Sequence, residues 1–106
     1  MESIAATDFI RLLNNKNSFQ WIDIRETWEF EEENFGGKNI PMAELPKAIN
    51  TGKIHPKSDI YLVCMTGMRA STAQLYLKQQ GFKSVVQVEG GVEALRAAYQ
   101  FTTDNQ

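Results

Sequence analysis

Residues 60–72, Ile-Tyr-Leu-Val-Cys-Met-Thr-Gly-Met-Arg-Ala-Ser-Thr, decide the fold of this chain. An apolar, β-prone run ends at Cys64, the only cysteine, and a helical pattern begins a few residues later. A strand that passes into a helix through a short loop directs backbone N–H groups and the positive end of the helix dipole toward one point. A thiol at that point is stabilised as the thiolate, its nucleophilic form. The stretch therefore predicts a reactive thiol in an anion-binding loop.

The competing interpretation is that Cys64 is a small hydrophobe that ends a buried strand, as free cysteines often are. Gly67 and Arg69 weigh against it. Gly67 permits positive φ or a close approach to a ligand, and the Arg69 fork of donors suits oxyanions. We expect Cys64 and Arg69 to be catalytic. The substrate-binding loop would consist of Met65, Thr66, Gly67 and Met68.

Strand-like and helix-like patterns alternate along the rest of the chain. Strands are expected at Ser3–Ile4, Phe19–Ile24, Ile60–Val63 and Val85–Val88. Helices are expected from N-caps at Thr7 and Thr27, and then over Met42–Ile49 with Pro46 disturbing it, Ala70–Gln80 and Val92–Tyr99. This alternation implies parallel pairing and an α/β fold, a three-layer domain with a central, mostly parallel sheet flanked by helices.

Local signals also predict where helices end. Gly81 is placed to end the fourth helix in the left-handed conformation, with Phe82 contacting Leu77. Asn14 to Asn17 should end the first helix, and residues 102–106 are expected to form a frayed tail.

Composition narrows the class of protein. A length of 106 residues supports one domain, residues 1–106, and a net charge of −2 gives no general attraction to nucleic acid or to membranes. A lone reactive thiol suits a reducing compartment, and the N-terminus lacks the features of a secretory signal, so a cytoplasmic protein is expected. The chain has no Cys-x-x-Cys, no clustered histidines and no nucleotide-binding fingerprint, so we expect no metal and no cofactor.

Four ordered motifs resemble the rhodanese-like sulfurtransferase domains. Cys64-x-x-Gly67-x-Arg69 resembles their active-site loop, and the match covers roughly residues 3–98. Asn34 stands where many members carry His, and Leu95 replaces the usual Trp. The other matching segments are Trp21–Glu26 with Glu29-Phe30, Gly37 with Asn39-Ile40-Pro41, and Gly81-Phe82 with Val88–Leu95.

The resemblance implies that Cys64 accepts a sulfane sulfur from thiosulfate or a persulfide and passes it to a thiol, to cyanide or to a protein acceptor. Arg69 would brace the loop or assist an anionic donor. One alternative is a cysteine phosphatase or arsenate reductase, whose loops are one residue longer between Cys and Arg and hold a tetrahedral oxyanion. Another is a non-catalytic binding or regulatory module of the same fold, against which the intact Cys64 argues.

Asp23 and Arg25 end a predicted central strand, where open α/β sheets place their sites, so they are candidate supporting residues. We favour a structural pair such as Arg25 with Glu29. The only histidine, His55, is expected on the surface and not as a base for Cys64.

Three further expectations concern exposure. The acidic run Glu29–Glu33 is interpreted as a solvated helix face. Met65 and Met68 should point outward and form the rim of the pocket. Trp21 and Trp28 are expected in or near the core.

Overall fold

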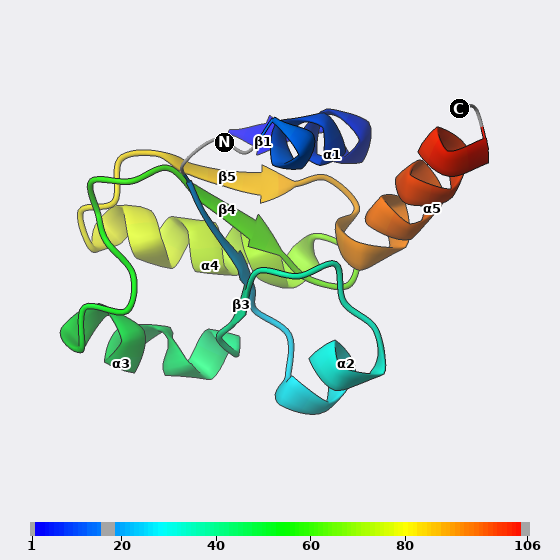
Figure 1. The fold of residues 1–106 in the computed structure, drawn as a ribbon. Helices are drawn as coiled ribbons and strands as arrows, with labels where there is room; N and C mark the ends of the chain where they lie inside the picture. The colour runs from blue at the N-terminus through cyan, green and yellow to red at the C-terminus, as the bar shows by residue number, and fades with distance from the viewer. Residues whose placement is uncertain (1, 16–18, 105–106) are drawn as a thin grey trace.

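A five-stranded parallel sheet, in the order β1-β5-β4-β2-β3, forms the centre of the computed structural model, which describes residues 2–15 and 19–104 (Figure 1). The strands are β1 (Ser3–Ile4), β2 (Gln20–Asp23), β3 (Lys38–Asn39), β4 (Ile60–Val63) and β5 (Val85–Val88). The helices are α1 (Ala6–Asn14), α2 (Thr27–Glu32), the 3-10 helix η1 (Met42–Glu44), α3 (Leu45–Asn50), α4 (Met68–Gln79) and α5 (Gly91–Asp104). The expected three-layer α/β fold is confirmed.

The side chains of β4 alternate between two hydrophobic cores, one on each face of the sheet. Leu62 and Cys64 belong to the core beneath α3 and α4, whereas Val63 belongs to the core beneath α1 and α5. Figure 1 shows α1 and α4 on opposite sides of the sheet. Burial on both faces explains the nearly continuous apolar run of this strand.

The cysteine lies at the point where the crossovers of the sheet change direction. The chain leaves β2 toward β3 on one side and leaves β4 toward β5 on the other. Asp23, the last residue of β2, is in register with Val63, the last residue of β4. Such a switch point opens a crevice at the carboxyl edge of the sheet, so the topology places Asp23 and Cys64 side by side at the position where ligands bind in open sheets.

Two predicted N-caps are wrong because other groups cap those helices. The N-cap of α1 is Ala5, with no side-chain cap, so Thr7 lies inside the helix. The N-cap of α2 is Glu26, which forms a capping box with Glu29. The two carboxylates accept each other's backbone N–H groups, which leaves Thr27 as the first helical residue.

Other element boundaries also differ from the prediction, and β2 is one residue shorter at each end than the predicted strand Phe19–Ile24. α4 begins at Met68, two residues before the predicted start, so Arg69 belongs to its first turn. The helix predicted over Met42–Ile49 divides into η1 and α3, and Pro46 lies in the first turn of α3, where a missing N–H is tolerated. α5 continues to Asp104, so residues 102–104 are helical and not a tail, while 105–106 lie outside the described residues.

One of the two tryptophans lies where it was expected. Trp21 is half-buried, with its ring centroid 5.3 Å from that of Phe9 in an edge-on contact. Trp28 is 62% exposed, so its expected place in or near the core is wrong. Among the described residues, no helix is both long and apolar enough to cross a bilayer.

The predicted helix stop at Gly81 is confirmed. Gly81 has a φ of +96°, and the Phe82 N–H donates to the carbonyl of Leu77 at 3.1 Å. The Gly81 N–H donates to the carbonyl of Lys78. These two hydrogen bonds together form the Schellman motif.

The turn from β5 into α5 packs directly on the cysteine loop. The Val92 N–H donates to the Cys64 carbonyl at 2.8 Å, and the Glu93 N–H donates to the Met65 carbonyl at 3.2 Å. Gly91, at a φ of +58°, lies so close that an added Cβ would stand 2.1 Å from the Cys64 carbonyl oxygen. A side chain at this position would displace the loop.

We therefore expect Gly91→Ala to destabilise the fold far more than Gly81→Ala. Both positions have positive φ, but a Cβ at Gly81 meets nothing within 4 Å. Backbone strain alone should cost Gly81→Ala about 1 kcal/mol of unfolding free energy, whereas the clash at Gly91 should add at least about 2 kcal/mol. Urea unfolding of both variants measures the difference, and equal losses would contradict the close approach.

Candidate functional site

Cys64 directly follows β4, and its Sγ accepts two backbone hydrogen bonds. The Gly67 N–H donates at 3.0 Å and the Ala70 N–H at 3.4 Å. Only Met65, Thr66 and Gly67 separate Cys64 from α4, and the left-handed φ of +106° at Gly67 turns the chain back toward the sulfur. Fixed N–H donors of this kind stabilise negative charge at the atom they face.

The thiol lies at the base of its loop. Cys64 is 1% exposed and belongs to the core beneath α4. The burial of Cys64 is what we expect of a small hydrophobe that ends a strand. The hydrogen-bond donors at Sγ are not, because an inert apolar side chain does not need them.

Arg69 is engaged by a carboxylate. Its two terminal nitrogens donate to Glu29 Oε1 at 2.7 Å and Oε2 at 2.9 Å, which joins the first turn of α4 to α2. The hydrogen bond from Arg69 lowers the pKa of Glu29 from 4.5 to about 2, against the opposing effect of burial, and the same contact raises the pKa of Arg69. The expectation of a solvated acidic face is therefore wrong for Glu29.

Asp23 and Arg25 form a buried ion pair beneath the site, each 1% exposed. Arg25 Nε lies 2.9 Å from one Asp23 oxygen, and a terminal nitrogen lies 2.7 Å from the other. The remaining Arg25 donors bind the backbone carbonyls of Glu29 and Glu33 in and just after α2. The expected side-chain pair of Arg25 with Glu29 is thus wrong, because Arg25 pairs with Asp23 and Glu29 pairs with Arg69.

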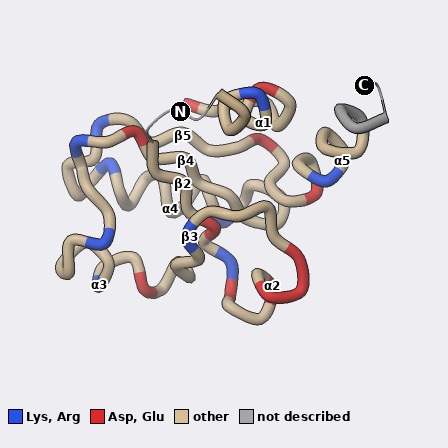
Figure 2. Tube along the Cα trace, viewed as in Figure 1, with Lys and Arg blue, Asp and Glu red and all other residues tan. Residues whose placement is uncertain are grey.

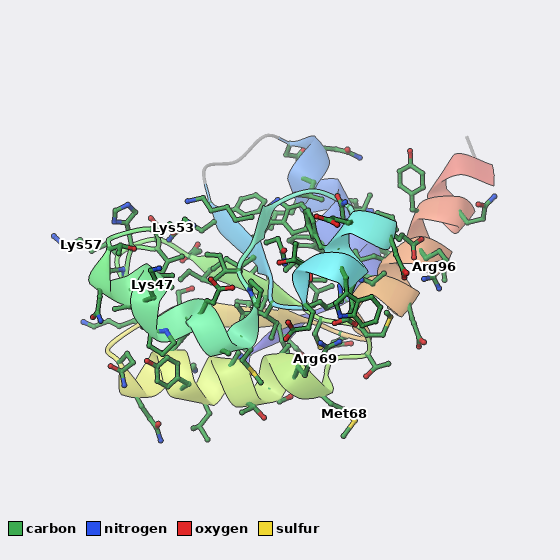
Figure 3. All side chains as sticks on the ribbon, turned by 90° about the horizontal axis from the view of Figure 1, so that it is seen from below. Lys47, Lys53, Lys57, Met68, Arg69 and Arg96 are labelled. Carbon is green, nitrogen blue, oxygen red and sulfur yellow. The ribbon has the colours of Figure 1, made fainter. Side chains whose placement is uncertain are left out.

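The other residues predicted to form the substrate-binding loop differ in how far their side chains are exposed to solvent. Met68 is 80% exposed and Thr66 is also exposed, whereas Met65 is half-buried and packs against the core beneath α5. Figure 3 shows Met68 projecting from the start of α4 near Arg69. The outward direction expected for both methionines therefore holds for Met68 and only in part for Met65.

His55 is exposed, as expected, and lies at the far end of the sheet. Its backbone N–H and carbonyl both hydrogen-bond to the side chain of Gln20, the first residue of β2. Cys64 follows the opposite, carboxyl ends of the strands, so His55 is not placed to act as its base.

Sequence reasoning missed two residues that hold the loop. Glu29 had a detectable signal in its capping-box spacing from Glu26, but nothing local indicated Arg69 as its partner. Gly91 had two signals, its place in a glycine pair and its place in the matching segment Val88–Leu95, but neither indicated that it packs on the cysteine loop. The two departures from the family motifs are accommodated locally, since Asn34 bonds the backbone of Phe30 and Gly36, and Leu95 is fully buried.

Comparison with known proteins agrees with this geometry. The rhodanese-like domain family model matches residues 5–98. The putative sulfur carrier protein YrkF of Bacillus subtilis (strain 168) is 31% identical over 90 residues, 84% of this chain and 48% of that protein. A tRNA uridine(34) hydroxylase of Buchnera aphidicola is 31% identical over 94 residues, 84% of this chain and 30% of that protein. The chain thus spans about half or less of these curated relatives.

A solved structure extends the likeness to the fold. The crystal structure of a rhodanese-like domain protein from Staphylococcus aureus superposes with a TM-score of 0.79 at 29% identity, covering 90% of this chain and 91% of that one. The match of the family model over most of the chain, with a parallel sheet that ends in a cysteine loop, shows that this protein belongs to the rhodanese-like domain family, a family of the sulfur-transfer type.

Proposed function

We propose that this chain transfers sulfane sulfur through a persulfide on Cys64. The observation that carries the proposal is the convergence of the Gly67 and Ala70 N–H groups on Sγ. The Cys64 thiolate attacks the outer sulfur of thiosulfate or of a persulfide, and the S–S bond of the donor breaks. Sulfite or a thiolate leaves with the electron pair, and the outer sulfur stays on Cys64 as a persulfide anion.

The second half of the cycle returns Cys64 to its thiolate. An acceptor thiolate or cyanide attacks the outer sulfur, the persulfide S–S bond breaks, and its electron pair returns to Sγ. The backbone N–H groups face Sγ, which carries the charge at the start of the first half and at the end of the second, and this is the logic of an oxyanion hole. No step needs a cofactor. A small sulfur donor, a thiol, cyanide or protein acceptor, and a reducing compartment such as the cytoplasm suit this chemistry.

Arg69 contributes mainly by bracing the loop. Its charge is paired with Glu29, so it gives an anionic donor little additional attraction while that pair is intact. In this proposal Met65, Thr66, Gly67 and Met68 bind the substrate, and Asp23 and Arg25 support the site by holding α2 in place.

The loop is less suited to phosphatase or arsenate reductase chemistry. Those reactions need a cradle for a tetrahedral oxyanion and an arginine free to clamp it. Here the loop is short, and Glu29 occupies both terminal nitrogens of Arg69. A purely non-catalytic module would not require N–H donors directed at a cysteine sulfur.

The persulfide on Cys64 should be detectable as an intermediate. Incubation with thiosulfate or a low-molecular-weight persulfide should add the mass of one sulfur atom to the intact protein, and cyanide or dithiothreitol should remove it. Cys64→Ser should show neither the adduct nor turnover, because the nucleophile is gone. Mass spectrometry measures both, and turnover that persists in Cys64→Ser would refute the assignment.

Loop length should decide the chemistry. One glycine inserted between Gly67 and Met68 lengthens the path from Cys64 to Arg69 and moves the N–H donors away from the sulfur. Sulfur transfer should fall by about a hundredfold, as expected for donors misplaced by about 1 Å. Hydrolysis of p-nitrophenyl phosphate by the unaltered protein should equal that of Cys64→Ser, and a clear cysteine-dependent phosphatase rate would favour the alternative.

The Glu29–Arg69 pair should give a stability difference that depends on pH. Glu29→Gln keeps a side chain that can complete the capping box, but it removes the carboxylate, and it should cost about 1 to 2 kcal/mol at pH 7. The folded pKa of Glu29 is lowered to about 2, so its stabilisation is fully present above the unfolded value of 4.5 and is lost as the pH falls toward 2.

Urea unfolding of both proteins between pH 7 and pH 2 tests this sign. The gap between the unaltered protein and Glu29→Gln should be constant above about pH 5 and should close below pH 4.5. A gap that widens on acidification would show that the pair does not stabilise the charged carboxylate.

A further inference from the structure

A hollow of about 160 Å³ opens beside the cysteine loop, between α2 and α5. Met65, the residue next to Cys64, lines it on the loop side, and Trp28 lines it from α2. Its remaining lining residues are Arg25, Glu29, Glu32, Glu33 and Arg96. We propose that Trp28 and Glu32 select the sulfur acceptor of Cys64, and that this acceptor is a thiol with a positively charged group a few bonds from its sulfur. The inference rests on the proposed sulfur transfer.

Trp28 supplies an aromatic face without a role in the core. It is 62% exposed, and it is one of four large hydrophobic side chains exposed among the described residues. Met68, which is 80% exposed, is a second such side chain and lies at the start of α4, directly after the cysteine loop. An exposed indole beside a hollow is suited to hold an ammonium or guanidinium group over its face.

The charges around the hollow leave one carboxylate unpaired. Three ion pairs neutralise the other charges: Glu29 with Arg69, Glu33 with Arg96, and Arg25 with Asp23. Glu32 is exposed, and its side chain has no hydrogen-bond or ion-pair partner among the residues that the structure describes. The hollow therefore presents an uncompensated negative charge to an incoming molecule.

The wider distribution of charge reinforces this sign. The tube in Figure 2 is acidic around α2, which borders the hollow. Figure 3 shows Lys47, Lys53 and Lys57 together on one side of the molecule and Arg96 on the other. None of these three lysines lines the hollow, so none of them is placed to pair with Glu32 there.

The size of the hollow limits what enters it. A volume of about 160 Å³ accommodates an aminoalkyl group but not a folded domain. The charged group would occupy the hollow while the acceptor thiolate attacks the outer sulfur of the Cys64 persulfide. The S–S bond breaks, the electron pair returns to Sγ, and the acceptor leaves as its own persulfide. A free aminothiol and a cysteine flanked by lysines in a protein segment share this chemistry.

The test measures discharge of the Cys64 persulfide to cysteamine and to 3-mercaptopropionate at matched thiolate concentrations. The ratio of the two rates, compared between variants, cancels the intrinsic reactivity of each thiol. Glu32→Lys should lower the cysteamine preference about fivefold, because attraction becomes repulsion at the hollow. Glu31→Lys is the matched control, since Glu31 is exposed on the same helix but does not line the hollow, and it should change the ratio less than about twofold.

Trp28→Ala tests the aromatic contribution separately. It should slow discharge of the persulfide to cysteamine about threefold and leave the rate of discharge to 3-mercaptopropionate unchanged. Tripeptides Lys-Cys-Lys and Glu-Cys-Glu form a second arm, and a larger discrimination between them than between the small thiols would identify a protein segment as the source of the acceptor.

Equal effects of Glu32→Lys and Glu31→Lys in both arms would overturn the inference. If the Cys64 persulfide forms and its discharge rate does not depend on the charge of the acceptor thiol, only the proposed role of the hollow is contradicted. A protein in which Cys64 never takes up sulfur contradicts the proposed function as well, so the two failures are distinguishable by mass spectrometry of the loaded protein.

Discussion

The buried ion pair between Asp23 and Arg25 is the interaction on which the rest of the site depends. Both side chains are 1% exposed, and a charge so deeply buried is costly unless its partner stays in place. Arg25 also binds the carbonyls of Glu29 and Glu33, and the Asn39 side chain donates to the carbonyls of Asp23 and Arg25. The pair thereby fixes how the chain leaves β2 and where α2 lies.

The position of α2 is transmitted to the cysteine through a second ion pair. α2 carries Glu29, which binds Arg69 in the first turn of α4 with both oxygens. The same end of α4 supplies the Ala70 N–H that faces the sulfur. From the other side, the start of α5 holds the carbonyls of Cys64 and Met65. The loop is therefore held by contacts from three elements, as a preorganised anion site requires.

Most charges near the loop are used to build it. The side chains of Arg25, Arg69 and Arg96 each have a carboxylate partner. What remains for an incoming anion is the short-range field of the backbone N–H groups, which acts on a single atom. In the proposed sulfur transfer, this division makes the backbone donors the groups that act on the reacting sulfur, although many charged side chains lie near the cysteine.

Local patterns predicted the features that depend on neighbouring residues in the chain. The bounds of β4 and β5 and the Gly81–Phe82 helix stop follow from short apolar runs and from one glycine, and the structure confirms them. The starts of α1 and α2 were misplaced because capping choices differ by only about 1 kcal/mol and depend on which group reaches the free N–H.

The sequence by itself determined a parallel α/β fold with its cysteine at a strand end, because hydrophobic period and turn chemistry are local properties. Only the tertiary structure decided that Glu29 binds Arg69, 40 positions away, and that Arg25 turns to Asp23. It also decided that Trp28 faces solvent. Such pairings depend on where α2 and α4 come to rest against the sheet, and a carboxylate has the same local pattern whichever arginine the fold brings to it.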